Sequence, residues 1–343
     1  MKALFLAAVS LLFVSTAPTV FAAGSFATRE DVRVFIAEMH EKHGFSKKVL
    51  QASFSRIKPI PAVIQAILPP RDPGVRSWQS YRARFVEPKR IDMGVKFWRQ
   101  YGAALTAANE KTGVPEEIVL AIIGIETIFG RHTGNFISLA ALATLAFDYP
   151  REPRVGDPTH SNSRAALFRR EMEELLLLAR EAHVDPLSFK GSYAGALGLP
   201  QFLPSSLRRY AVDGDQDGRI DLSASKEDAI ASVANFLKEH GWEKDGPVAV
   251  AACVEGDKFS ALIEEGIVPR RMPSEMVSYG VTSADAPNQP AALIDLVTPQ
   301  QPAEYRLGYR NFYVLTRYNR SSFYAAAVLD LAQELRASRS RNQ

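Results

Sequence analysis

Apolar residues recur at helical spacing through the first part of the chain. Val32, Phe35 and Met39 lie at three- and four-residue intervals, which places them on one face of a helix. Residues 28–109 are therefore predicted to be mostly helical. Several prolines between residues 59 and 73 are expected to break this region into short helices, because proline cannot donate the helical hydrogen bond.

Four further segments carry helix signals. They are residues 115–130, 163–182, 226–241 and 322–335. The first is the clearest, because Pro115 suits the first helical position and Glu116 and Glu117 complement the positive helix end. Gly130 provides the expected stop signal.

The pattern changes after residue 241. Prolines become frequent and separate short apolar stretches at residues 248–254, 292–297 and 312–315. Short apolar runs between turns are typical of strands, so this region is predicted to be a small β-rich module. The predicted fold class is mainly α (α+β), with a helical body and one small strand-bearing insertion.

Composition and charge narrow the function. The chain has 343 residues, 46% of them hydrophobic and 23% charged, which excludes a disordered or fibrous protein. The formal charge of +3 comes without a basic stripe, so nucleic acid is not an expected partner. The single cysteine, Cys253, cannot form an intrachain disulfide and is expected to be a small buried apolar residue.

The N-terminus has the layout of an export signal. Lys2 precedes an apolar run over residues 3–14, and small residues follow up to Ala23. Residues 1–23 are predicted to be a cleaved signal peptide, and the alternative is a buried N-terminal helix. No cysteine near the expected cut could carry a lipid, and no later run predicts a membrane helix. The expectation is a soluble, periplasmic protein without a lipid anchor.

One carboxylate stands in an unfavourable position. Residues 118–129 are apolar on nearly every face, yet they contain Glu126. Burial and the negative end of the helix dipole both disfavour the ionised form, so the carboxyl is expected to stay protonated near neutral pH. A general acid needs this property. The alternative is a structural glutamate paired with Arg131 or another cation.

A glycine-spaced segment follows at residues 191–206. Its glycines, Gly191, Gly195 and Gly198, permit positive φ and close approach of the backbone. Four side chains in it are suited to hydrogen bonding and stacking on a sugar: Ser192, Tyr193, Gln201 and Phe202. The Lys and Ser/Thr pair of a phosphate loop is missing. A binding loop and a tight structural turn are both consistent with the pattern.

An acidic segment resembles most of an EF-hand loop. Carboxylates occupy positions 1, 3, 5 and 9, and position 7 would bind a cation through its carbonyl; the residues are Asp213, Asp215, Asp217, Asp221 and Arg219. Ala224 replaces the bidentate glutamate of position 12, which predicts weak affinity. A structural Ca²⁺ or Na⁺ is expected because all ligands are oxygen, and the alternative is a solvated acidic turn.

Several segments are jointly specific although each is weak alone. They are residues 78–85, 124–127, 130–131, 141–151, 191–206, 213–221, 233–235, 240–242 and 317–324. Together they resemble the lytic murein transglycosylase B family over nearly all of the chain. This resemblance implies a lysozyme-like helical core and cleavage of the β-1,4 bond between N-acetylmuramic acid and N-acetylglucosamine in peptidoglycan. The implied product ends in 1,6-anhydromuramic acid, and no catalytic cofactor is implied.

The resemblance also suggests an organisation into domains. A signal peptide at 1–23 precedes an N-terminal helical domain at 24–109. The lysozyme-like catalytic core with its EF-hand-like loop then spans 110–243. A small β-rich subdomain at 244–311 and a C-terminal segment at 312–343, which returns to the core, complete the chain. Peptidoglycan glycan strands are the implied partner, and cell-wall synthesis proteins are candidate partners.

Residue roles follow from matching positions. Glu126 is the implied single catalytic acid and base. Positions that line the glycan cleft are matched by Tyr81, Ser192, Gln201, Tyr318, Asn319 and Tyr324. The acidic segment matches the family's cation loop. Two departures stand out: the lipid-bearing cysteine of many members is missing, and Phe236 replaces an expected cleft tyrosine.

Three other functions compete with this one. A catalytically inactive peptidoglycan-binding or scaffold protein would keep the same cleft residues. A hydrolytic muramidase would use water, and a retaining one would need a second carboxylate about 5 Å from the first. No second acid lies beside Glu126 or in the glycine-spaced segment. A calcium sensor is the remotest alternative, because only one incomplete loop is present.

Overall fold

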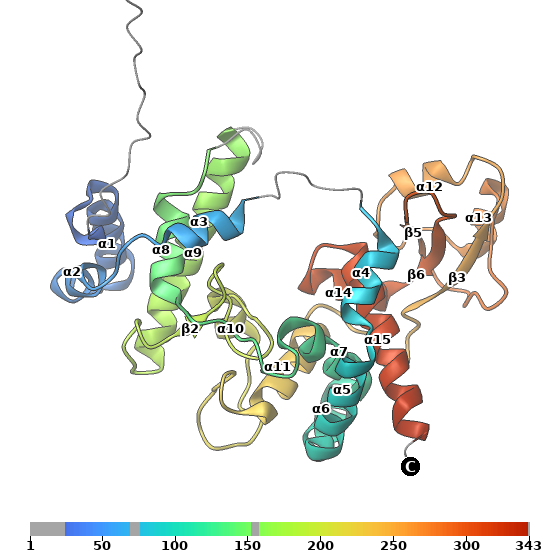
Figure 1. Ribbon diagram of the computed structural model, residues 1–343, viewed down its shortest axis with the longest axis horizontal. Helices are drawn as coiled ribbons and strands as arrows, with labels where there is room; N and C mark the ends of the chain where they lie inside the picture. The colour runs from blue at the N-terminus through green and yellow to red at the C-terminus, as the bar shows by residue number, and fades with distance from the viewer. Residues whose placement is uncertain (1–24, 69–75, 152–157, 342–343) are drawn as a thin grey trace, which may run out of the picture.

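The computed structural model describes residues 25–68, 76–151 and 158–341. The predicted signal peptide lies outside this range. Figure 1 shows α1 and α2 at one end of the molecule and the larger sheet at the other, with α7 between them. The first helices are α1 (Glu30–His43), α2 (Lys47–Ser55), α3 (Pro61–Ile67), α4 (Trp78–Phe85), α5 (Pro88–Gln100) and α6 (Gly102–Thr112).

The middle of the chain is also helical. It contains α7 (Glu116–Thr127), α8 (Ser138–Phe147), α9 (Pro158–Glu181), α10 (Pro204–Tyr210) and α11 (Lys226–Glu239). Two short strands, β1 (Phe136–Ile137) and β2 (Lys190–Gly191), pair antiparallel beside them. Helix α7 packs against α5, α6, α11 and α15, which explains why nearly all its side chains can be apolar.

The last third contains the larger sheet. Its strands are β3 (Ala249–Val254), β4 (Val281–Thr282), β5 (Ala292–Leu296) and β6 (Glu304–Gly308), in the order β4-β3-β6-β5 with antiparallel pairing. Short helices α12 (Ser260–Glu264) and α13 (Pro273–Met276) lie between β3 and β4 in the chain. Helices α14 (Arg310–Tyr318) and α15 (Ser322–Arg341) follow, and α15 returns to α7.

Two expectations about this region are wrong. Residues 312–315 are not a strand, because they belong to α14, where Phe312 and Leu315 lie on one buried helix face. Cys253 is exposed rather than buried. Side chains alternate between the two faces of β3, and Ala251 and Cys253 both lie on its exposed face.

The mainly helical fold with a small β-rich part is as predicted. Strands at 249–254 and 292–296 also fall where the sequence places them. In the part of the chain that the structure describes, no helix combines the length and the apolar character needed to cross a bilayer.

Candidate active site

Glu126 lies in the last turn of α7, among side chains that are buried. Residues 117–125 of the helix are all buried, whereas Glu126 keeps part of its surface accessible. Its Oε1 accepts a hydrogen bond of 2.8 Å from the Tyr324 hydroxyl. Burial raises the pKa of Glu126 from 4.5 to about 7, although the Tyr324 hydrogen bond lowers it. The carboxyl can therefore donate a proton and later accept one near neutral pH.

The ion pair on which the alternative role of Glu126 depends is not found. Arg131 is exposed, and no ion pair to Glu126 occurs among the described residues. Burial raises the pKa of Glu126 and the Tyr324 hydrogen bond lowers it, and no charge of the described residues adds to the rise. A second carboxylate close enough to act as a nucleophile would add to that rise by repulsion.

The chain turns sharply after Glu126. Ile128, Phe129 and Gly130 have φ of 51°, 57° and 88°, and the left-handed region is costly for the first two. Thr127 holds this turn, because its buried hydroxyl donates to Leu199 O at 3.0 Å and accepts from Gly130 N at 3.0 Å. The end of α7 is thus tied directly to the glycine-spaced segment.

Close packing fixes the ring of Phe129. A Cβ placed on Gly124 would lie 2.7 Å from Phe129 Cζ, and one on Gly94 would lie 2.9 Å from the same atom. Only glycine leaves room for the ring at these two positions. Helices α5 and α7 therefore hold the Phe129 ring of the strained turn in place. This contact helps to fix the position of Glu126, which directly precedes the turn.

The glycine-spaced segment is a built loop. Ser192 Oγ accepts hydrogen bonds from Ala194 N at 3.3 Å and Ala196 N at 3.1 Å. Gln201 has a φ of 51°, and its Nε2 donates to Thr133 O at 3.1 Å and Gly198 O at 2.9 Å. These bonds give the loop a fixed conformation beside the end of α7.

Three tyrosines from separate helices surround Glu126. Tyr318 and Tyr324 stack with ring centroids 6.2 Å apart, and the Tyr318 hydroxyl donates to Pro200 O at 2.5 Å. Burial raises the pKa of both well above the ordinary value, and the Glu126 charge adds to this. Burial and the Glu126 charge also raise the pKa of Tyr81 on α4. The hydroxyls therefore stay neutral and can act as donors.

The acidic segment brings three carboxylates together. Oxygens of Asp213, Asp215 and Asp217 lie within 4.8 Å of one another. Asp213 Oδ2 accepts from Gly218 N, but its buried Oδ1 has no hydrogen-bond partner among the described residues. A buried anionic oxygen without a donor fits a site for a cation with oxygen ligands.

Asp221 does not join this cluster, contrary to the expected ligand set. Its Oδ1 accepts from Ser223 N and Ala224 N, each at 2.9 Å, and so caps the following turn. Asp228 closes the loop instead, because its two oxygens accept from Gly214 N and Asp221 N at 2.7 Å. The structure therefore supports three of the four predicted aspartates as side-chain ligands.

Comparison with known proteins gives the family. Residues 27–333 match the family model described as "Transglycosylase SLT domain". The chain belongs to the transglycosylase SLT family. It is 40% identical to membrane-bound lytic murein transglycosylase B of Escherichia coli K12 over 329 residues, covering 92% of this chain and 85% of the relative.

Solved structures agree with this family membership. Soluble lytic transglycosylase SltB1 of Pseudomonas aeruginosa superposes with a TM-score of 0.82 at 41% identity, covering 90% of this chain and 99% of that one. The Escherichia coli transglycosylase Slt35 in complex with calcium has a TM-score of 0.78 at 39% identity, covering 93% and 96%. The resemblance drawn from the sequence motifs and the lysozyme-like fold that it implied are confirmed.

The structure brings three of the predicted cleft residues together at Glu126. Tyr81, Tyr318 and Tyr324 gather at Glu126, as described above. Tyr193, which is 39% exposed, and the exposed Asn319 remain available to a ligand. Their contact with substrate stays a prediction, as it does for Ser192 and Gln201.

Phe202 is the exception. It is only 3% exposed and packs against Phe236 and Tyr318, with centroids 5.4 Å and 5.8 Å away. It supports the floor of the site and cannot stack on a sugar as expected. Phe236 is likewise buried, with its ring stacked on His240 at 4.1 Å.

Sequence reasoning missed two residues that shape the site. The Thr127 hydroxyl joins α7 to the glycine-spaced segment, and no local pattern indicates its partner, Leu199. Asp228 could have been found, because Ser225 three residues before it is the N-cap of α11 and accepts from Asp228 N. An acidic residue at that position has its side chain directed back over the preceding loop.

Proposed function

We propose that this protein is a peptidoglycan lytic transglycosylase in which Glu126 is the only catalytic acid and base. The observation that carries the proposal is a carboxyl at the end of the buried helix α7, hydrogen-bonded to Tyr324 and without an ion pair among the described residues. Burial raises its pKa to about 7. The bond cleaved is the β-1,4 linkage between N-acetylmuramic acid and N-acetylglucosamine. The relatives' printed names, lytic murein transglycosylase and lytic transglycosylase, support this substrate.

The reaction needs two proton transfers. Protonated Glu126 donates to the glycosidic oxygen while the muramic ring takes on oxocarbenium character. The substrate's own N-acetyl group can stabilise that positive charge. Glu126, now ionised, then accepts the proton of the 6-hydroxyl, whose oxygen attacks the anomeric carbon. The acid form is regenerated, no water is consumed, and the product ends in 1,6-anhydromuramic acid.

The surroundings of Glu126 favour this route over hydrolysis. A retaining hydrolase needs a second carboxylate about 5 Å away, and an inverting one needs a base that activates water. Neutral tyrosines occupy this region instead, from α4, α14 and α15. We assign Tyr81, Ser192, Tyr193, Gln201, Tyr318 and Asn319 to glycan binding.

Mass spectrometry of digested murein sacculi tests the proposal. Soluble muropeptides that carry anhydromuramic ends are the expected product. Products heavier by one water would make the protein a muramidase, and the absence of soluble product would make it an inactive binder. Heat-denatured protein serves as the control for autolysis of the sacculi.

Location and organisation complete the proposal. We propose export directed by residues 1–23, with action in the periplasm on glycan strands. The predicted divisions near residues 110, 244 and 312 are kept as domain boundaries. In the structure the second of them precedes β3, and the third lies inside α14.

We further propose that the acidic loop binds a structural Ca²⁺ through Asp213, Asp215 and Asp217. The unpartnered Asp213 Oδ1 and the close approach of the three carboxylates support it. The Slt35 structure with calcium supports the choice of metal. The loop is joined to the site, because Leu199 N donates to Leu222 O at 2.8 Å. A bound cation would thus stabilise the glycine-spaced segment.

Calcium is expected to stabilise the wild-type protein modestly. With a dissociation constant of about 1 mM, 10 mM Ca²⁺ adds about 1.4 kcal/mol to the free energy of unfolding, or roughly 3 °C in Tm. Asp215→Asn should abolish the shift because it removes one charge from the cluster. Differential scanning calorimetry with and without EGTA measures this. An equal shift in Asp215→Asn would refute the assignment, and Asp257→Asn, in the β-rich part, is the matched control.

A further inference from the structure

We propose that a charge network of Arg82, Asp330 and Arg306 positions Tyr81 against Glu126, so that the β-rich part of the chain controls glycan binding. The proposal rests on the proposed function of Glu126 and Tyr81. It gives a role to residues 249–308, which contain none of the predicted site residues. The three members of the network come from α4, α15 and β6.

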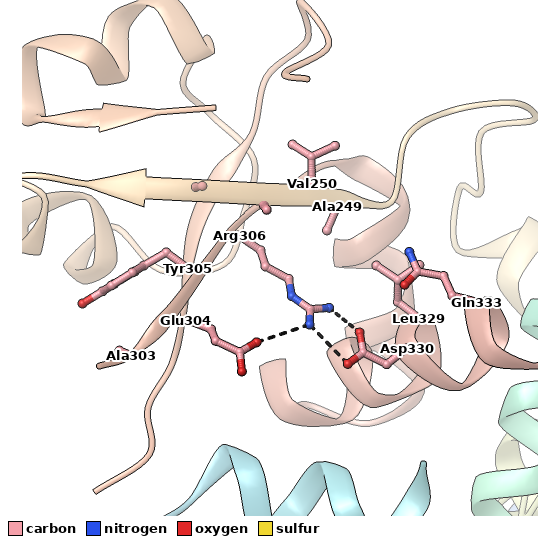
Figure 2. A pocket seen from close by; sticks show the side chains of 11 residues that line it. Ala249, Val250, Ala303, Glu304, Tyr305, Arg306, Leu329, Asp330 and Gln333 are labelled. Atoms are coloured by element: carbon pink, nitrogen blue, oxygen red, sulfur yellow. Dashed lines mark hydrogen bonds and ion pairs between the residues drawn. The ribbon is translucent and has the colours of Figure 1, made fainter. Parts of the chain in front are cut away.

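Asp330 is the centre of the network. Its side chain is only 6% exposed, and it accepts from Arg82 Nε at 2.6 Å and from Arg306 at 2.6 Å and 3.2 Å. Figure 2 shows Arg306 reaching from β6 to Asp330 on α15, with Glu304 on its other side. Glu304 lies 3.7 Å from Arg306 and is 59% exposed, so its contribution is small.

The network lies beside a cavity of about 440 Å³ between β3, β6 and α15. The cavity wall on β3 consists of three alanines and Val250. The space lets water reach a side chain shorter than arginine at position 306. A substitution at this position can therefore be tolerated by the fold, whereas removal of Asp330 would leave two guanidinium groups without their shared partner.

Helix α4 packs on α15, and its first residues are bonded to the β-rich part. At its N-terminus, Trp78 N donates to Val297 O at 2.8 Å and Gln79 N donates to Thr298 Oγ1 at 3.2 Å. The Arg306 guanidinium lies 5.6 Å from the Trp78 ring centroid. Arg82, one turn later, reaches Asp330. The loop after β5 and strand β6 therefore fix both the start and the rotation of this eight-residue helix.

The same helix carries Tyr81 to the site. Trp78 and Tyr81 stack with centroids 6.5 Å apart, and the Tyr81 ring lies 5.7 Å from Phe323. Phe323 directly precedes Tyr324, which donates to Glu126. Arg306 contacts Trp78, and Trp78 contacts Tyr81, so a change at Arg306 can reach Tyr81 through one residue. The Tyr324–Glu126 hydrogen bond instead joins α15 to α7. The network should therefore affect substrate binding more than proton transfer.

Steady-state kinetics on soluble glycan fragments test this role. Arg306→Gln is expected to raise KM about tenfold and to change kcat less than about twofold, because the acid is untouched. In a Tyr81→Ala background the same substitution should change KM less than about twofold, because the residue it positions is gone. Arg306→Lys, which keeps one charged contact, should recover part of the wild-type KM.

Matched variants separate positioning from general destabilisation. Arg271→Gln breaks an ion pair with Glu265 in the same β-rich part, away from α4, and should leave KM unchanged. If Arg306→Gln folds poorly, Thr298→Val removes only the Gln79 contact and should raise KM about twofold. The proposal would be overturned if KM were unchanged in Arg306→Gln or in Thr298→Val. It would also be overturned if the changes in KM caused by Arg306→Gln and Tyr81→Ala multiplied in the double variant.

Hydrogen exchange gives a readout that is independent of turnover. In Arg306→Gln the amides of α4 should exchange faster, while those of α7 keep their wild-type rates. Equal rates in both proteins would show that the network does not hold α4. A wild-type protein that releases no anhydro product would instead refute the proposed function, and the exchange data would still report on the network.

Discussion

Glu126→Gln is expected to reduce release of anhydromuropeptides by about 10⁴-fold or more, because one side chain performs both proton transfers. The amide can neither donate to the leaving oxygen as an acid nor accept the 6-hydroxyl proton. The fold should be retained, since the glutamine oxygen can still accept the Tyr324 hydrogen bond that Glu126 Oε1 accepts. Turnover of sacculi followed by mass spectrometry measures the loss, and near-wild-type turnover would remove Glu126 from its role.

The same substitution should change how stability depends on pH. The folded protein holds the Glu126 proton up to a pKa of about 7, against 4.5 ordinarily. Wild-type stability should therefore fall as pH rises between these values, by at most about 3 kcal/mol. Glu126→Gln lacks this loss. Its free energy of unfolding, measured with urea, should equal that of the wild type below pH 4.5 and exceed it above pH 7.

Glu116→Gln is the matched control on the same helix. Burial raises the pKa of Glu116, but hydrogen bonds from Thr106, Trp98 and Arg339 outweigh it and lower the pKa below the ordinary value. Glu116 therefore stabilises the folded state above its unfolded pKa, and this stability is lost as pH falls. Glu116→Gln should therefore lower the free energy of unfolding at neutral pH and leave the activity unchanged. A pH-independent difference between wild type and Glu126→Gln would contradict the buried acid.

Local sequence information was sufficient to predict α7 and to single out Glu126. The helix, Glu116–Thr127, begins where the proline and the acidic pair predict, but it ends before Gly130, at the left-handed Ile128. The apolar run that predicts burial also makes Glu126 stand out, because a carboxylate there needs a reason. Fold class and the family could be inferred in the same way, from segments that carry their own signals.

Strand β6 shows where local information fails. Glu304, Tyr305 and Arg306 do not look like part of a buried strand, yet Arg306 is largely buried because Asp330 pairs with it. The partner lies 24 residues away on another element. Sequence patterns record which residues are apolar, but a buried charge is explained only by its partner in the folded chain.

The details of the site depend on similar distant contacts. Tyr324 and Glu126 are separated by 198 residues, and their hydrogen bond could not be derived from spacing. The left-handed Ile128 and Phe129 contradict the ordinary preference of their residue types. Phe202 has a side chain suited to sugar stacking, but the rings of Phe236 and Tyr318 cover it. Residue type alone cannot distinguish a cleft wall from its support.

Tyr324→Phe is expected to move the alkaline limb of kcat/KM to higher pH. The Tyr324 hydroxyl stabilises the ionised form of Glu126, so its removal should raise the pKa of that carboxyl above about 7. The acid form would then persist to higher pH. Activity at neutral pH should still fall, by about tenfold to a hundredfold, because a weaker acid donates less readily to the leaving oxygen and the carboxyl loses the hydrogen bond that orients it.

Tyr318→Phe separates this effect from a general loss of the aromatic surroundings. Its hydroxyl donates to Pro200 O and not to Glu126, although its ring stacks on Tyr324. The variant should lower kcat/KM by a similar factor at every pH and leave the alkaline limb in place. The pH profiles of kcat/KM for the two variants are measured on the same soluble glycan fragments. Together they show whether the Tyr324 hydroxyl alone controls the Glu126 proton. If the alkaline limb moved in neither variant, burial alone would set the acidity of Glu126, and Tyr324 would only orient it. If it moved equally in both variants, the control would belong to the tyrosine pair and not to the Tyr324 hydroxyl.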